Sequence, residues 1–296
     1  MEKEEIENYV KAGKIAAQTL EYGKNLIKKD VLLVEVVDRV EEKIFSLGGR
    51  PAFPAQVSCN HIAAHNCPEQ DDKTTFSDQV VSLDVGVHID GFIADNAVTV
   101  DLSGKHGDLI KASREALNNA IGLIKPGIAL FQIGKTIQEA IQKYGFAPVR
   151  NLSGHGLARY TQHTKPSIPN FDNNDNTKIK EGMVFAVEPF ASTGAGIVEE
   201  IGVPTVFSLE KIKPVRNPIT REVLKEIGTY DGLPFTTRWL TKKFGAKAKF
   251  ALREMNQLGI IHSYPPLADR NKGIVSQAEH TVLIDNGGNV ILTTKL

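Results

Sequence analysis

Apolar residues recur at helical spacing in several stretches of the chain. Residues 4–28 and 34–47 each show the pattern of an amphipathic helix, and the second pattern stops at Gly48-Gly49, a common helix C-terminal signal. A further helical pattern covers about 107–124. Short apolar runs bounded by turn residues predict the strands, which are 80–89, 92–101, 183–192, 197–208, 274–285 and 289–295.

The predicted strands are grouped in hairpins. Asp90-Gly91 joins the first two strands, and "NGGN" joins the last two; both are strong hairpin turns. Strands that follow one another directly, instead of alternating singly with helices, favour an antiparallel α+β arrangement over a doubly wound sheet.

One helical unit occurs twice. "LIKKDVLLVEVVDRVEEKIFSLGGRPAFP" begins at Leu26, and "LIKPGIALFQIGKTIQEAIQKYGFAPV" begins at Leu123, 97 positions later. The two copies match at apolar, Gly and Pro positions without a gap. Each copy follows another helical pattern and precedes strand-like sequence. We therefore expect two similar halves, each a helix pair that feeds a sheet, and not a solenoid, since only two copies exist.

The residue composition and pattern change between 209 and 265. This stretch is basic and helix-patterned, with Pro-containing segments on both sides, so it predicts a helical insertion. The predicted division is a catalytic domain of 1–208 and 266–296, interrupted by an inserted helical subdomain of 209–265.

The composition is that of a soluble globular protein. The chain has 296 residues, is 41% hydrophobic and 24% charged, and has a formal net charge of zero, so neither DNA nor an anionic membrane is indicated. No signal-peptide pattern or run of roughly 18–20 apolar residues is present. The two cysteines are too few for a disulfide scaffold and are not paired like zinc ligands, so we expect a cytoplasmic protein. The even charge and the lack of an obvious exposed apolar stripe make a monomer the default expectation.

Two carboxylates interrupt the apolar hairpin of 80–101. With the turn at Asp90-Gly91, Gly86 faces Asp95, and Asp84 shares the face of Gly86 because strand side chains alternate. Asp84 and Asp95 are then diagonal neighbours on one face, with Cα atoms roughly 7–8 Å apart. A divalent cation between them would remove their repulsion and the cost of burying them. The alternative is that both lie on the solvent face of an edge hairpin.

Other polar residues lie in apolar strands or glycine-rich loops. Glu188 and Glu279 each lie in an apolar strand, and His155 lies between two glycines, with His163 eight residues later. Taken singly, each is as readily a surface or turn residue. Two Asp, two Glu and one His together suit Mn, Fe, Co or Zn. Four carboxylates exceed the need of one cation, so the set predicts two divalent metal ions.

The order of the motifs "DVG…D", "GHG", "EP" and "EHT" resembles the methionine aminopeptidases, which have the pita-bread fold. The gap of 91 residues between Glu188 and Glu279 is similar to that of the type II subfamily, with its helical insertion, and the short N-terminal segment is similar to that of the archaeal enzymes. The resemblance implies a cytoplasmic enzyme that removes the initiator methionine from nascent polypeptides when the second residue is small.

The resemblance also implies a role for each metal-binding residue. Asp84 would bind one metal ion, Asp95 and Glu279 would bridge the two, and His155 and Glu188 would complete the second. Glu188 would in addition act as general base and later as general acid.

Three further residues take a role from the resemblance. His163 would hydrogen-bond the scissile carbonyl, His65 would contact the substrate near the scissile bond, and Phe53 would line the methionine pocket. The chain departs from the family at Gln162, where an aliphatic residue is usual, and in the acidic loop of residues 66–78, which follows His65.

Two alternatives remain open from the sequence. Xaa-Pro peptidases use the same fold and the same ligands, although they usually carry an additional N-terminal domain. Non-catalytic relatives bind RNA or ribosomes, but they have substitutions at the metal positions, which are intact here. The basic segment "TKKFGAKAKFALR" is either a transient ribosome contact or a solvated helix face.

Overall fold

The structure is a computed structural model that describes residues 1–295. Its helices are α1 (Lys3–Leu26), α2 (Leu33–Ser46), α3 (Gly107–Leu123), α4 (Leu130–Lys143), α5 (Pro218–Ile227), α6 (Thr237–Phe244) and α7 (Lys247–Gln257), with a 3₁₀ turn at Gly228–Tyr230. Its strands are β1 (Arg50–Pro51), β2 (Gln56–Cys59), β3 (Ile62–Ala64), β4 (Val80–Ile89), β5 (Phe92–Asp101), β6 (Ala147–Pro148), β7 (Ser153–Ala158), β8 (Thr161–Pro169), β9 (Val184–Val187), β10 (Phe190–Ser192), β11 (Val198–Glu200), β12 (Val206–Leu209), β13 (Phe235–Thr236), β14 (Ile261–Tyr264), β15 (Leu267–Asp269), β16 (Val275–Gln277), β17 (His280–Ile284) and β18 (Val290–Leu292). Within this described part, no helix combines the length and the apolar character needed to cross a bilayer.

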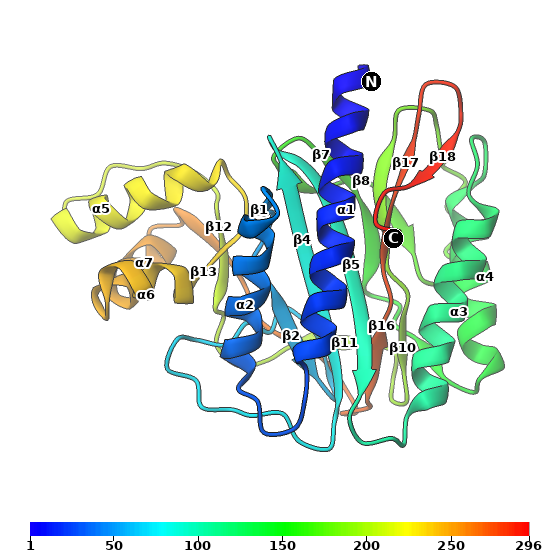
Figure 1. The fold of residues 1–296 in the computed structure, drawn as a ribbon, viewed down its shortest axis with the longest axis horizontal. Helices are drawn as coiled ribbons and strands as arrows, with labels where there is room; N and C mark the ends of the chain where they lie inside the picture. Colours follow the sequence, from blue (N-terminus) through cyan, green and yellow to red (C-terminus); the bar gives the residue numbers. More distant parts are fainter. Residues whose placement is uncertain (296) are drawn as a thin grey trace.

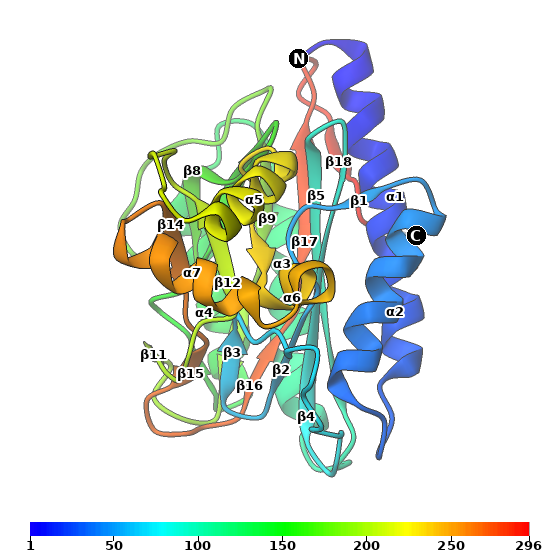
Figure 2. The same cartoon turned by 90° about the vertical axis from the view of Figure 1, so that its left-hand side faces the viewer.

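The hairpin of β4 and β5 is the centre of the first half. Its strand limits agree with the predicted 80–89 and 92–101, and its register pairs Gly86 with Asp95, as predicted. β1 and β2 pair with the other edge of β4. Helices α1 and α2 lie side by side against β4 and β5 (Figure 2), and their buried apolar faces form one core with the sheet. This core fixes which face of β4 is left for Asp84.

The second half repeats the helical unit of the first. α2 and α4 have equal lengths and are offset by 97 residues, as are β1 and β6. The glycines that follow the two helices, Gly48 and Gly145, both have positive φ, of 83° and 80°, a backbone conformation that favours glycine. α3 and α4 pack on the sheet with strand order β18-β17-β9-β7-β8, to the right in Figure 1. The predicted two-fold repeat is therefore confirmed.

Three predicted strands are wrong in their continuity. Residues 183–192 divide into β9 and β10 at Glu188-Pro189, and 274–285 divide into β16 and β17 at Ala278-Glu279. The chain passes from the five-stranded sheet to a three-stranded sheet with order β16-β10-β6 at the first break, and back in the opposite direction at the second. Proline has no N–H to donate to a ladder, which favours the break after Glu188. Residues 197–208 likewise divide into β11 and β12, in two further sheets.

The helices α5, α6 and α7 lie together at the left of Figure 1 and share one apolar core with β12, β13 and β14. The predicted boundary at 209 cuts β12 at its last residue, since β12 pairs with β13 and β14 of this region. The division into a catalytic domain and an inserted subdomain stays a prediction, and we refer to residues 209–265 as the insertion.

Candidate metal centre

A cavity of about 390 Å³ opens between the two halves. It contains seven of the eight residues singled out from the sequence, and Phe53 is the exception. The cavity is lined by Gln56, Ala64, His65, Asp84, Asp95, Asn151, Leu152, Ser153, His155, Gln162, His163, Thr164, Ser167, Glu188, Phe190, Gln277 and Glu279.

Each predicted metal ligand enters the cavity from a different strand or strand end. Asp84 and Asp95 come from β4 and β5, and His155 comes from β7. Glu188 and Glu279 lie at the two strand breaks, which face each other because Val187 pairs with His280 and Phe190 pairs with Gln277. The breaks are therefore part of how the fold brings the two glutamates to the same place.

The ligand atoms of this set lie close together. One side-chain atom from each of Asp95, His155 and Glu279 falls within 4.8 Å of the others. His155 Nε2 lies 3.7 Å from Asp95 Oδ2 and 3.5 Å from Glu188 Oε1. The Oδ1 atoms of Asp84 and Asp95 are buried and have no hydrogen-bond partner among the described residues. Buried carboxylate oxygens without donors are costly, so the donor set fits divalent cations.

The electrostatics agree with this interpretation. Burial raises the pKa of Asp84 to about 7. Burial first, and then the neighbouring carboxylates, raise the pKa values of Asp95, Glu188 and Glu279 well above their ordinary range. Burial, together with His163, lowers the pKa of His155 to about 3, so its imidazole is neutral at physiological pH. A group of neutral imidazole and unpaired carboxylates is suited to bind metal.

Two histidines form the wall beside this set. The ring centroids of His155 and His163 are 4.3 Å apart at an angle of 88°, and burial lowers the pKa of His163 to about 4. His65 has a φ of 62°, and its backbone N–H donates to Gln56 Oε1 at 2.7 Å. Its Nδ1 lies 3.2 Å from the carbonyl oxygen of Pro265. Because that carbonyl can only accept, Nδ1 carries the proton and Nε2 is left as an acceptor.

Phe53 lies beneath the centre instead of at the cavity wall. Its side chain is 1% exposed, and its ring occupies the space above Gly86 where a Cβ would be. The aromatic residue that does line the cavity is Phe190. Gln162 also lines the cavity, and a side-chain hydrogen bond from Gln162 acts on Asp95, where it opposes the rise in pKa caused by burial and Asp84.

Two of the cavity residues that the sequence analysis missed hold other site residues in place. Gln277 donates through Nε2 to Glu279 Oε2 at 3.3 Å, and Gln56 holds the backbone of His65. Gln277 stands two positions before Glu279, a spacing that could have drawn attention to it. His61 and His280, which have no predicted role, are not among the residues that line this cavity.

Comparisons with known proteins agree with this site. The model of metallopeptidase family M24 matches residues 7–286. The methionine aminopeptidase of Archaeoglobus fulgidus is 43% identical over 99% of this chain and 100% of its own length. That of Methanocaldococcus jannaschii is 44% identical over the full length of both chains. A solved methionine aminopeptidase from Thermotoga maritima superposes with a TM-score of 0.72 at 25% identity, over 100% of this chain and 98% of the other.

The similarity covers the whole chain, and the fold is the pita-bread fold that the motifs indicated. Both the relatives and the buried donor set point to the same class of enzyme. The chain therefore belongs to metallopeptidase family M24, among its methionine aminopeptidases.

Proposed function

We propose that this protein removes the N-terminal methionine of polypeptides with two divalent metal ions, and that it prefers a small second residue. The observation that carries the proposal is the convergence of five donor side chains from separate strands in one buried cavity. Carboxylate oxygens that lack hydrogen-bond donors support a pair of cations in particular, because one cation needs fewer ligands.

The metal ions would be held by Asp84, Asp95, His155, Glu188 and Glu279, and the ligand set suits Co, Mn, Fe or Zn. Bound there, they would supply Lewis acidity toward the peptide carbonyl and toward water. Two donors are already oriented by the protein. Glu279 accepts from Gln277, and the backbone N–H of Asp95 donates to the Thr281 hydroxyl at 2.7 Å, which fixes the strand that carries Asp95.

Glu188 would be the group that moves the proton. A carboxylate oxygen of Glu188 takes a proton from the reacting water and returns it to the leaving amine. Its position at the end of β9, next to His155 and inside the cavity, allows it to serve both the metal ions and the water. Without bound metal, burial and the charges of Asp95 and Asp84 raise its pKa well above the ordinary range of a glutamate.

The neutral histidines would bind the peptide. His163 donates an N–H to the oxygen of the scissile carbonyl, where negative charge develops. His65, with Nε2 free as an acceptor, receives a backbone N–H of the substrate. The ring of Tyr264 lies 5.6 Å from that of His65, and crowding on this side of the cavity is what we expect to limit the second residue.

The proposed substrates are the N-termini of nascent polypeptides in the cytoplasm. The protein would act on them as a monomer, with at most a transient contact to the ribosome. Three lysines of the basic insertion are paired with carboxylates: Lys242 with Asp38, Lys243 with Glu226 and Lys249 with Glu69. These pairs reduce the positive charge available to RNA, and this favours the solvated helix face over a nucleic-acid surface.

The test is hydrolysis by protein reconstituted with Co²⁺, Mn²⁺, Fe²⁺ or Zn²⁺, on Met-Ala-Ser, Met-Trp-Ser and an Xaa-Pro peptide. We expect Met release from Met-Ala-Ser, little from Met-Trp-Ser and none from the Xaa-Pro peptide. Calorimetric titration of metal-free protein should show two bound ions per chain. Preferential cleavage of the Xaa-Pro peptide would transfer the proposal to the prolidase type of activity, and a single bound ion would refute the dinuclear centre.

A further inference from the structure

A buried arginine fixes the insertion to the first half of the protein. Arg238, in α6, is fully buried. Its Nη1 and Nη2 donate to the two carboxylate oxygens of Glu41 in α2 at 2.9 and 2.6 Å, and Nη1 also contacts Asp38. A two-pronged pair of this kind fixes orientation as well as distance. Arg238 therefore defines how the insertion sits on α2.

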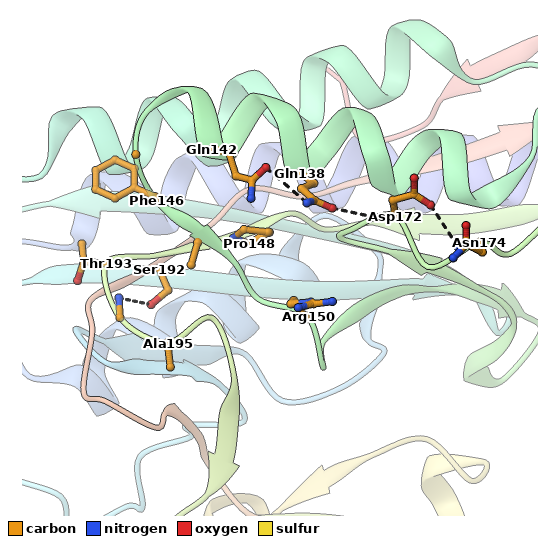
Figure 3. A pocket seen from close by; sticks show the side chains of 13 residues that line it. Gln138, Gln142, Phe146, Pro148, Arg150, Asp172, Asn174, Ser192, Thr193 and Ala195 are labelled. Carbon is orange, nitrogen blue, oxygen red and sulfur yellow. Dashed lines mark hydrogen bonds between the residues drawn. The ribbon is translucent and has the colours of Figure 1, made fainter.

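The second half shows that the helical unit itself does not need this charge. Gln138 in α4 stands 97 positions after Glu41. In Figure 3, Gln138 lies at the edge of an open cavity of about 650 Å³, where its Oε1 accepts from the backbone N–H of Asp172 at 3.0 Å and its Nε2 donates toward Gln142. No residue of the insertion lines that cavity. The carboxylate at position 41 is therefore specific to the half that contacts the insertion, and the repeated helical unit forms without it.

Glu41 also holds groups on both sides of the junction. It accepts from Trp239 Nε1 of the insertion at 2.8 Å and from the backbone N–H of Ala55 at 3.2 Å. Ala55 directly precedes β2. All of these donors point at one buried carboxylate, so removal of its charge would leave Arg238 without its main partner.

The junction continues to His65. Gln56, next to Ala55, accepts the backbone N–H of His65 through its side chain. Cys67, two residues after His65, donates through its thiol to the Thr236 hydroxyl at 3.5 Å, and its backbone carbonyl accepts from the Thr205 hydroxyl at 2.8 Å. The loop of His65 is therefore fixed on one side by the first half and on the other by the start of α6.

The ring of His65 is held by the end of the insertion. Its Nδ1 meets the carbonyl of Pro265, and its ring packs edge-on against Tyr264, the last residue of β14. β14 pairs with β12 in the sheet that packs with α6 and α7. A shift of the insertion on α2 would therefore move the two contacts that set the direction of the His65 ring.

We propose that the Glu41–Arg238 pair is a positioning element for substrate binding: it fixes the insertion on α2 so that Tyr264 and Pro265 hold the His65 imidazole at the cavity wall. The proposal rests on the proposed function for the role of His65. None of the five predicted metal ligands contacts Glu41 or Arg238 among the hydrogen bonds and ion pairs of the described residues, so metal binding should not depend on the pair.

The variants Glu41→Gln and Arg238→Lys test the pair. Glu41→Gln introduces the side chain that α4 has at the matching position, Gln138. Arg238→Lys keeps the positive charge but loses the two parallel hydrogen bonds of the guanidinium. We expect KM for Met-Ala-Ser to rise about tenfold, with kcat changed by less than about threefold and the metal dissociation constant by less than about twofold. Glu35→Gln is the matched control, because Glu35 is on the same helix and, within residues 1–295, pairs only with the exposed Arg39. The KM of this variant should stay at the wild-type value.

A double-mutant cycle with His65→Ala distinguishes an effect on the position of His65 from a general loss of structure around the cavity. If the pair acts through His65, Glu41→Gln should change KM by less than about twofold in the His65→Ala background. An equal rise in KM with and without His65, an unchanged KM, or a parallel loss of metal affinity overturns the proposal. Should Glu41→Gln fail to fold, Trp239→Phe, which removes only one donor to Glu41, takes its place, with an expected rise in KM of about threefold.

The proposed function is tested separately by wild-type cleavage of Met-Ala-Ser. The ratios of KM between variants can be measured on whichever peptide the wild-type protein cleaves. A different substrate class would therefore refute the proposed function and leave the test of the Glu41–Arg238 pair intact.

Discussion

The contact between Gly86 and Phe53 predicts the effect of adding one methyl group beneath the metal centre. Gly86 lies two residues after Asp84 and opposite Asp95. A Cβ at position 86 would lie 2.1 Å from Phe53 Cε1, 2.4 Å from Cδ1 and 2.7 Å from Cζ. Gly86 does not have a positive φ, so the backbone itself accepts alanine. The expected effect of Gly86→Ala is therefore steric.

The structure gives the magnitude. Carbon atoms pack at roughly 3.5–4.0 Å, so the ring of Phe53 must retreat by about 1.4 Å or the strand must move. Phe53 is 1% exposed, so it has no space into which to retreat. Overpacking of this kind costs about 1–3 kcal/mol. The gain from a stiffer unfolded chain is about 0.4–1 kcal/mol, which is smaller, so Gly86→Ala should lower the free energy of unfolding by about 1–2 kcal/mol.

The assay is urea unfolding of the wild type, Gly86→Ala, Phe53→Leu and the double variant. Phe53→Leu makes room for the methyl group, so the double variant should be more stable than the sum of the single effects predicts. Metal affinity should fall in Gly86→Ala, since the displaced strand carries Asp84. The control is Gly107→Ala, where a Cβ meets nothing within 4 Å. Equal stability of Gly86→Ala and the control, or strict additivity with Phe53→Leu, would refute the steric reasoning.

Two further predictions concern the metal centre. Glu188→Gln should retain metal, measured by calorimetry, yet lower kcat by about 10²–10⁴-fold, since it removes the proton carrier; near-normal turnover would contradict that role. In metal-free protein, burial raises the pKa of Asp84 to about 7, so the folded state keeps a proton that the unfolded state has released. Histidines of the unfolded chain, with an ordinary pKa of about 6.5, are mostly neutral above about pH 7. The free energy of unfolding of the metal-free protein in urea should therefore fall as the pH rises from about 7 to 8, and saturating Mn²⁺ or Co²⁺ should restore it; a rise with pH would contradict the burial of unpaired carboxylates.

Much of the fold followed from local sequence. The Asp90-Gly91 turn set the register of β4 and β5, because a two-residue turn leaves one way to pair the strands. The repeat was visible because the helix, its terminal glycine and the following proline obey the same local rules in both halves. These features depend on residues close to one another in the chain.

The breaks at Glu188 and Glu279 could not be read from pattern. Both glutamates lie in apolar runs whose pattern is the same as that of a continuous strand. Only the pairing of β9 with β17 in one sheet, and of β10 with β16 in another, shows where each run is divided. The place of Phe53 above Gly86 could not be read from the sequence for the same reason, because the segment between β1 and β2 and the middle of β4 meet only in the folded chain.

The sequence by itself determined the chemical types of the candidate metal ligands, their order, the two helical units and the central hairpin. Each of these features depends on residues that are close to one another in the chain. Tertiary structure alone decided that four carboxylates and an imidazole share one buried cavity, and that Arg238 reaches Glu41 across 197 positions. The physical reason is that burial and long-range pairing depend on how the sheets and helices pack, and the free energy of a buried charge is set by partners that lie far away along the chain.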